Sequence, residues 1–421
     1  MKLNSLFLLF FSMWLCTSPY KESTGSVQNL GNIPKAAGIK GKARNIWDLQ
    51  VFEDKIYLGY GSTTSNTGPT TLWAYDPAID KLTSYCEIAT EAIERFRVWN
   101  DTLFVPNSDP TYGDNSKFTY VVGNTCAHIS LKHKMAHVRD IYFHKGKYYL
   151  LGNTRCPNSA ATDCAGLITM TDLQGSYDNT LLANTFSEVA PLFNKNWNWF
   201  FGMMEVDSQL IIPNAMFTLA YHPRLPIKDN SFFVIADDSL RWSALQADSL
   251  RSKHAHFYPV NTNAQTVRDT MELRTSLRVS EHTSYKGKTL YTLRTYSSHK
   301  PIYHKAYNNS CGLMIKDSLL APAQRVHFPA ENAVGEDIKV VENSLYVLAN
   351  KKVRKDSFQV FVYTADSPDS QADCWTEVLH FDSRNMARSF EYHQGYFYFG
   401  LGCNEGEEVL DAGQLLRVKR P

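Results

Sequence analysis

The chain has 421 residues, with 43 basic and 42 acidic side chains and a formal net charge of +1. This balance gives no electrostatic reason to expect a nucleic acid or a strongly anionic membrane surface as partner, so neither is predicted. Apolar residues make up 43% of the chain and charged residues 20%, which is ordinary for a folded protein with a sizeable core.

The first eighteen residues (1–18) have the pattern of an export signal. A basic start, Met1-Lys2, precedes an almost continuously apolar stretch from Leu3 to Leu15 that is too short to span a bilayer. We therefore predict a signal peptide and no transmembrane helix. Cys16 lies where the lipidated cysteine of a bacterial lipoprotein would fall, so a secreted protein and a cell-surface protein with a lipid anchor at Cys16 both remain open.

A strand–turn–strand phrase recurs seven times along the rest of the chain. Each copy holds a hydrophobic strand, a turn at Asp, Asn, Gly or Ser, and a returning β-rich strand. The copies cover residues 46–61, 94–107, 138–153, 200–214, 281–294, 335–350 and 388–402. Repeats of roughly 40–50 residues that hold several short strands are typical of a β-propeller. No helical periodicity extends over three turns, so the prediction is an all-β, seven-bladed β-propeller.

The last repeat is too short for four strands, whereas residues 25–40 precede the first repeat. We predict that an N-terminal strand completes the last blade, because this closes the ring and removes an exposed edge. The chain then divides into a signal peptide (1–18), an N-terminal segment with the closing strand (19–44) and the propeller (45–421).

Some cysteines of an exported chain should form disulfides, because thiols pair in an oxidising compartment. Cys156 and Cys164 lie eight residues apart in a polar loop and are predicted to form a disulfide. No spacing resembles a zinc knuckle. His254 and His256 would place two imidazoles on one face of a strand, but the sequence fixes no third ligand, so neither a metal nor a cofactor is predicted.

Charged residues gather where the first strand of each repeat begins. The repeats are aligned on their second strands, so that Ile56 matches Leu290 in the fifth repeat. In this alignment the residues equivalent to Asp48 are Arg95, Asp140, Gly202, His282, Asp337 and Ser389. The residues at the preceding position are Trp47, Glu94, Arg139, Phe201, Glu281, Glu336 and Arg388. Charge at a channel-lining strand start is costly unless the groups pair or meet water. The candidate binding residues, expected to converge at one end of the channel, are Arg139, Asp140, Glu281, His282, Glu336, Asp337 and Arg388.

Two interpretations of these residues remain. In one, acids, arginines and His282 form a polar ligand site with acid/base groups and a carboxylate clamp. In the other, opposite charges neutralise one another and fix the spacing of the blades. Because adjacent strand residues point to opposite faces, half of the set should enter the channel and the rest should wedge between blades as Glu–Arg pairs.

Several segments resemble a family of exported bacterial β-propellers that mostly lack an assigned activity. They are IWDL, YLG, NTGP and LWAYDP within residues 46–77, ERFRV at 94–98, VPNSDP at 105–110 and HVRDI at 137–141. The resemblance implies the fold and export and carries over no catalytic residue. The architecture is also similar to seven-bladed propeller polysaccharide lyases, but their ordered set of two histidines, a tyrosine and an arginine is not found here.

Two classes of function follow. The first is an exported propeller that binds a polysaccharide or a cell-surface protein at one face of the central channel. The second is a carbohydrate-active enzyme, a polysaccharide lyase or a glycoside hydrolase, that uses the charged channel mouth. We favour the first because fold alone does not imply chemistry and no catalytic motif is present. The sequence leaves the catalytic residues, and whether the protein is an enzyme at all, undecided.

Overall fold

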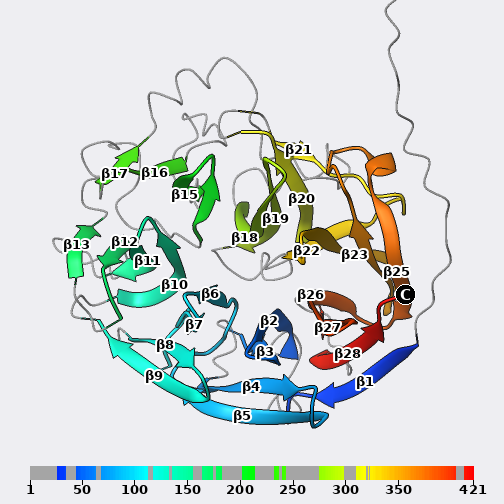
Figure 1. The fold of residues 1–421 in the computed structure, drawn as a ribbon, viewed down its shortest axis with the longest axis horizontal. Helices are drawn as coiled ribbons and strands as arrows, with labels where there is room; N and C mark the ends of the chain where they lie inside the picture. The colour runs from blue at the N-terminus through cyan, green and yellow to red at the C-terminus, as the bar shows by residue number, and fades with distance from the viewer. Residues whose placement is uncertain are drawn as a thin grey trace, which may run out of the picture.

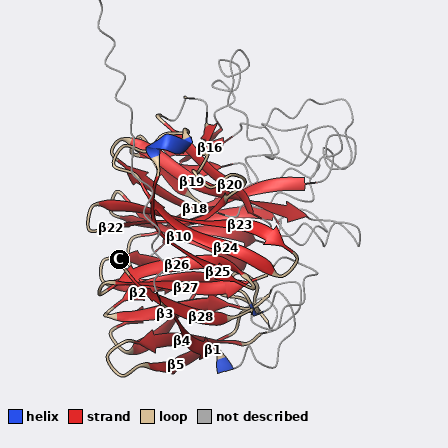
Figure 2. Ribbon diagram, turned by 90° about the vertical axis from the view of Figure 1, so that its right-hand side faces the viewer, coloured by secondary structure: helices blue, strands red, loops and turns tan. Residues whose placement is uncertain are grey.

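The computed structural model describes residues 26–34, 44–62, 68–111, 117–131, 135–154, 164–173, 177–182, 202–213, 232–236, 239–242, 275–297, 310–318, 321, 323–403 and 412–421, and the structural statements below refer to these ranges. The described strands form seven four-stranded antiparallel sheets, arranged in a ring around one axis (Figure 1). Helix within these ranges is limited to short 3-10 turns such as Ala372–Cys374 (Figure 2). The predicted all-β class and propeller architecture are confirmed.

Each sheet runs outward from a strand near the axis. The inner strands are β2 (Ile46–Phe52), β6 (Arg97–Trp99), β10 (Met135–His144), β14 (Met204–Val206), β18 (Thr275–Tyr285), β22 (Val334–Val341) and β26 (Met386–His393). The second strands are β3 (Lys55–Tyr60), β7 (Thr102–Val105), β11 (Lys147–Thr154), β15 (Gln209–Pro213), β19 (Lys288–Ser297), β23 (Ser344–Arg354) and β27 (Tyr396–Gly402). The third strands are β4 (Thr70–Asp76), β8 (Lys117–Val122), β12 (Cys164–Met170), β16 (Phe232–Ala236), β20 (Ser310–Lys316), β24 (Ser357–Thr364) and β28 (Gln414–Lys419). The outer strands are β5 (Lys81–Ile88), β9 (Thr125–Ser130), β13 (Tyr177–Leu182), β17 (Ser239–Trp242), β21 (Gln324–Arg325), β25 (Thr376–Ser383) and β1 (Val27–Asn32).

The sheet of β26, β27 and β28 contains both ends of the described chain. Its fourth strand is β1, which pairs antiparallel with β28 from Val27↔Val418 to Asn32↔Gln414. Figure 1 shows β1 beside β28 at the edge of the ring. This pairing covers the edge of β28 that would otherwise be exposed.

Tight turns between the inner and second strands set the register of each sheet. All seven have two central residues with positive φ, as at Glu53-Asp54 and Lys286-Gly287, which is the geometry of two-residue hairpins. The pairs Phe52↔Lys55 and Tyr285↔Lys288 flank these turns and are therefore equivalent.

This register corrects the sequence alignment of the fifth repeat by one residue. The position of Ile56 is taken by Thr289, not by Leu290, and the position of Asp48 is taken by Glu281, not by His282. The alignment failed because it matched apolar residues, whereas the turn at Lys286-Gly287 determines which residues pair.

Four inner strands carry a one-residue bulge between two paired residues at the same place, and β18 has a register shift there too, between Val279 and His282. The bulged residues lie between the paired residues Ile46 and Asp48, Val138 and Asp140, Gly335 and Asp337, and Ala387 and Ser389. They are Trp47, Arg139, Glu336 and Arg388. A bulge redirects side chains locally, and three of these residues belong to the predicted site.

Apolar side chains fill the space between neighbouring sheets. Leu348 of β23, for example, belongs to one buried cluster with Phe390 of β26 and Phe399 of β27. A disulfide between Cys86 of β5 and Cys126 of β9 joins two adjacent outer strands, with 6.4 Å between the Cα atoms. A disulfide was predicted, but between other cysteines.

Several sequence predictions fall outside the described residues. Cys156, and with it the predicted Cys156–Cys164 bridge, is among them, as are His254, His256 and the predicted signal peptide at 1–18. Within the part of the chain that the structure describes, no helix is long and apolar enough to cross a membrane.

Candidate functional site

A cavity of about 620 Å³ lies at the centre of the ring. Its walls come from β2, β6, β18, β22 and β26, together with the turns that follow β22 and β26. The charged and histidine residues of the lining are Asp48, Arg97, Glu281, His282, Lys339, Glu342, Glu391 and His393, and the aromatic residues are Phe96, Trp99 and Tyr392.

The cavity meets solvent on the face where the inner strands end in hairpin turns, called the hairpin face below. Glu342 and Gln394 are turn residues of this rim and are exposed. Asp48, near the start of its strand, is only 3% exposed. The lining therefore runs from an open rim to buried charges in the interior.

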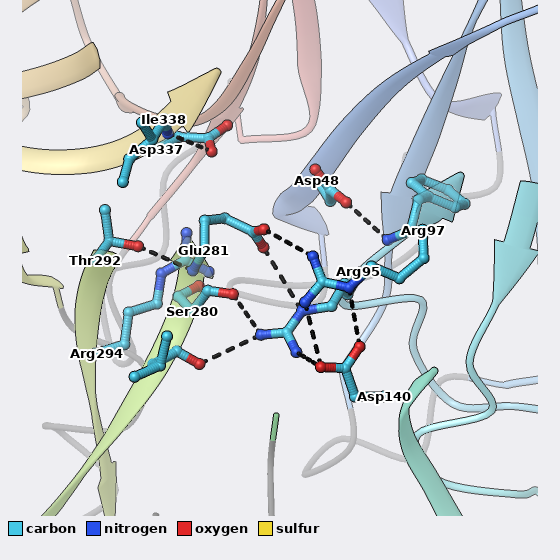
Figure 3. A network of polar contacts seen from close by, with 12 residues as sticks. Asp48, Arg95, Arg97, Asp140, Ser280, Glu281, Thr292, Arg294, Asp337 and Ile338 are labelled. Carbon is cyan, nitrogen blue, oxygen red and sulfur yellow. Dashed lines mark hydrogen bonds and ion pairs between the residues drawn. The ribbon is translucent and has the colours of Figure 1, made fainter. Parts of the chain in front are cut away.

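Buried arginines from the second sheet hold Asp140 at the inner end of the site. Asp140 Oδ2 accepts a hydrogen bond from Arg95 Nη1 at 2.8 Å, and Asp140 Oδ1 accepts one from Arg97 Nε at 3.0 Å (Figure 3). Arg95 also donates to the carbonyl oxygens of Val279 and Ser280 on β18. Although burial opposes its charge, Arg95 and Arg97 hold the pKa of Asp140 below its usual range, so this carboxylate is ionised.

Glu281 reaches the same arginines from the opposite sheet. Its carboxylate lies 3.7 Å from Arg95 Nε and 3.6 Å from Arg97 Nη1, so β18 contacts the second sheet across the channel. Burial raises the pKa of Glu281 even though Arg95 and Arg97 lower it. The protonated form of Glu281 is thus more favoured than that of an ordinary glutamate.

A second buried cation balances acids on the other wall. Lys339 Nζ lies 3.5 Å from both Asp48 Oδ1 and Glu391 Oε2, and it donates a hydrogen bond to the Leu49 carbonyl at 2.8 Å. Burial acts against its charge, but Glu391 and Asp48 hold the pKa of Lys339 above its usual range. Lys339 is therefore charged and shared between two carboxylates.

The aspartates at the recurrent strand-start position also connect neighbouring sheets. Asp48 accepts a hydrogen bond from Phe96 N at 2.7 Å, and Asp140 and Asp337 accept equivalent bonds from Met203 N at 2.8 Å and Phe390 N at 2.9 Å. Each donor lies in the inner strand of the next sheet or directly before it. These side chains fix the spacing of the sheets, and Glu281 differs in reaching across the channel instead.

Glu336 and Arg388 lie on the other side of the inner strands, away from the cavity lining. Glu336 Oε1 is 3.1 Å from Arg388 Nη1 and 3.2 Å from Arg294 Nη2, and the guanidinium of Arg388 stacks over the Trp47 ring at 5.3 Å. Arg388 is 0% exposed and Glu336 is 1% exposed. The four residues come from four consecutive sheets, so they form a strut, as strand alternation predicts for this half of the set.

Arg139 also lies apart from the cavity lining. It is buried, and its charge acts on Glu91, whose pKa burial and Asp109 together raise to about 7 although Arg139 lowers it. Of the seven predicted site residues, the structure therefore brings only Glu281 and His282 into the cavity lining.

His282 supplies a neutral polar group inside the cavity. Its ring stacks on Tyr142 with 5.8 Å between centroids. Burial, together with Arg97, holds the pKa of His282 well below its usual range. His282 Nδ1 and the lining Trp99 Nε1 are buried and have no hydrogen-bond partner among the described residues. Buried polar atoms of this kind usually meet a partner, so both are available to a ligand.

Sequence reasoning missed Arg97, Lys339 and Glu391. All three lie two residues after the recurrent strand-start position, on the same side of the inner strand. A charged residue in the interior of an otherwise apolar strand was the available signal. Among the described residues, no group of histidine, cysteine and acidic side chains is arranged to hold a metal ion.

No protein-family model matches the sequence, and no curated protein is significantly similar to it. Among solved structures, the polysaccharide lyase Uly1 is 11% identical with a TM-score of 0.44, over 97% of this chain and 94% of that one. The α-L-arabinanase of Penicillium chrysogenum is 8% identical with a TM-score of 0.42, over 94% and 99%. The β-propeller domain of the Trilobed protease from Pyrococcus furiosus is 10% identical with a TM-score of 0.44, over 88% and 95%. Similarity at this level indicates nothing about a shared activity.

Proposed function

We propose that the protein is an exported seven-bladed propeller that binds a glycan in its central cavity, from the hairpin face. The observation that carries the proposal is the composition of the cavity, where buried charged groups and aromatic rings line the same space. Sugars combine hydroxyl groups, which pair with charged and polar side chains, with apolar ring faces, which stack on aromatic rings. Trp99 and Tyr392 supply such rings, and Arg97, Lys339 and Glu391 supply the polar groups.

Two other features support the wider proposal. The disulfide between Cys86 and Cys126 fits an oxidising compartment outside the cytoplasm. The pairing of β1 with β28 fits a ring whose last blade is completed by the N-terminal strand. A rigid closed ring would hold the cavity walls in place before the ligand arrives, which lowers the entropic cost of binding.

A carbohydrate-active enzyme is the second candidate, and one specific observation favours it. Glu281, a carboxyl group with a raised pKa, lines the same cavity as Asp48 and Glu391. Enzymes that cleave glycosidic bonds use a carboxylic acid of raised pKa together with a second carboxylate. In this role Glu281 would donate the proton and one of the other carboxylates would act as base or nucleophile.

A glycan array followed by calorimetry on the best ligand tests the first proposal. We expect Trp99→Leu and Glu342→Gln to weaken binding at least tenfold, because both residues line the cavity. Glu53→Gln is the matched control, since Glu53 occupies the same turn position in the first sheet but lies outside the lining. An array without any bound glycan, or equal losses in the control, would contradict the proposal. Release of new reducing ends or unsaturated uronate from the bound glycan would establish the enzymatic alternative.

A further inference from the structure

The charges that line the cavity do not balance. Four carboxylates, those of Asp48, Glu281, Glu342 and Glu391, face two cationic groups, those of Arg97 and Lys339. Behind this lining, Asp140 and Asp337 add two acids and Arg95 adds one cation. The strut of Arg294, Glu336 and Arg388 lies on the other side of the inner strands.

The cations of the site are already engaged by protein groups. Arg95 and Arg97 are held by Asp140 and Glu281, and Lys339 is shared between Asp48 and Glu391. Glu342 lies at the exposed rim, but without it the inner acids still outnumber the inner cations by five to three. An excess of ionised carboxylates away from solvent is unfavourable, so either protons or an added cation must compensate it.

The cavity also offers an acceptor that suits an N–H donor. Neutral imidazole carries one nitrogen with a free lone pair, and His282 Nδ1 has no partner among the described residues. His282 follows Glu281 directly in the chain and lines the same cavity. A carboxylate and a neutral imidazole together can accept two hydrogen bonds from one ammonium group.

We infer that the ligand of the cavity is an amino sugar whose protonated amine binds between Glu281, His282 and the neighbouring carboxylates. This inference rests on the proposed glycan-binding function and names the class of sugar. The amine enters as an ammonium ion and supplies the positive charge that the lining lacks. In exchange, a carboxylic acid of the cluster releases its proton to solvent, so that the net charge of the site is kept.

Asp337 and Glu281 are the carboxyl groups that could release this proton. Burial, with Glu281 and Asp48, raises the pKa of Asp337 to about 8 although Lys339 lowers it, and burial raises the pKa of Glu281. Asp337 is therefore largely protonated at pH 7 without ligand. The ammonium in the cavity and the proton on Asp337 behind the lining compensate the same cluster of acids, so binding of one displaces the other. Affinity should therefore rise as pH increases from 5 to 7, by up to tenfold per pH unit for one proton released.

Calorimetry with glucosamine oligomers, the matching N-acetylated oligomers and a lysine-containing tripeptide tests the inference. We expect the glucosamine oligomer to bind at least tenfold more tightly than its N-acetylated form. Measured in two buffers of different ionisation enthalpy at pH 7, binding should release up to one proton per ligand. Glu281→Gln should abolish the preference for the amine, and Glu391→Gln should reduce it, while Glu53→Gln should leave it unchanged.

The outcomes separate this inference from the function on which it rests. If neutral and N-acetylated glycans bind as tightly as the amine, or if no proton is released, the amino-sugar inference is wrong and glycan binding stands. If no glycan binds, the proposed function itself is wrong. Binding of the tripeptide alone would show that the cavity recognises an amine on a peptide, which also overturns the inference. Melting temperatures of the variants, measured in parallel, ensure that each remains folded.

Discussion

Glu281 faces Arg97 across the central channel, with 3.6 Å between Glu281 Oε2 and Arg97 Nη1. The two residues come from β18 and β6, which belong to different, non-adjacent sheets. The three recurrent aspartates accept a backbone hydrogen bond from the next sheet, whereas the longer side chain of Glu281 spans the space between opposite sheets. The contact therefore links the stability of the ring to the charge of the cavity.

A double-mutant cycle with Glu281→Gln and Arg97→Met should reveal this coupling. Each single variant leaves a buried charge with fewer partners and should lower the free energy of unfolding by about 3–5 kcal/mol. The double variant should lose about 1–3 kcal/mol less than the sum of the two, because the residues interact directly. Urea unfolding provides the measurement. The control is the pair Lys288–Asp317, whose side chains are 28% and 68% exposed, and it should couple by under about 1 kcal/mol. Strict additivity would show that the contact carries no energy.

Arg388→Ala should act on stability and not on ligand binding. Arg388 is fully buried, pairs with Glu336 at 3.1 Å and donates to the Cys403 carbonyl at 2.9 Å. Its removal takes one of two arginines from the buried Glu336, which keeps Arg294, and should cost about 3–5 kcal/mol in the free energy of unfolding. The exposed Arg354 is the control, where alanine should change stability by less than about 0.5 kcal/mol. If the Arg388→Ala protein has wild-type stability but has lost its affinity for the ligand, Arg388 belongs to the binding site and the prediction is wrong.

Loss of the Cys86–Cys126 bridge should destabilise the chain measurably. The bridge closes a segment of 40 residues between two outer strands, and a loop of this length corresponds to about 4 kcal/mol in the chain-entropy model. We expect Cys86→Ser to lower the midpoint of urea unfolding, and reduction of the wild-type protein to lower it by a similar amount. Peptide mapping without reduction should recover the two cysteines in one linked fragment. Recovery of both as free thiols would contradict the bridge.

The repeat pattern predicted the propeller because each copy carries its own turn and strand signals, which are local. The turn at Lys286-Gly287 gives the correct register of the fifth repeat. The sequence alignment missed this register because it placed the apolar Leu290 opposite Ile56. The disulfide was not predictable in the same way. Cys86 and Cys126 are brought together by the packing of adjacent sheets, and no spacing in the sequence encodes that contact.

The site was predicted only in part for a related reason. A sequence shows that charges recur at the strand starts, but the bulges decide which of two neighbouring residues faces the cavity. Arg139, Glu336 and Arg388 are bulged residues and lie apart from the cavity lining, whereas Glu281 lines it. The cations that complete the site, Arg97 and Lys339, lie two residues after the strand starts, where a charge inside an otherwise apolar strand was the available signal.

Stability of the protein should fall as pH rises from 5 to 8. Burial raises the pKa of Asp337 to about 8, well above the value near 4 of an unfolded aspartate. Between these values the folded protein binds a proton that the unfolded chain does not, so stability falls as pH rises. The contribution is fully present below about pH 4 and is lost as pH passes through about 8. One such group gives a slope of at most about 1.4 kcal/mol per pH unit, and the raised pKa values of Glu281 and Glu91 act in the same direction.

Urea unfolding of the wild-type protein and of Asp337→Asn at intervals from pH 5 to pH 8 measures this contribution. Asparagine cannot bind the proton, so the slope of stability against pH should be shallower in the variant by up to the contribution of one proton. Its amide has one acceptor oxygen for the two N–H groups of Ile338 and Phe390, so stability should also be lower at every pH. Asp382→Asn, at an exposed position on β25, is the matched control and should keep the wild-type slope. Identical slopes for wild-type and Asp337→Asn would show that Asp337 is ionised in the folded protein and that Lys339 outweighs burial.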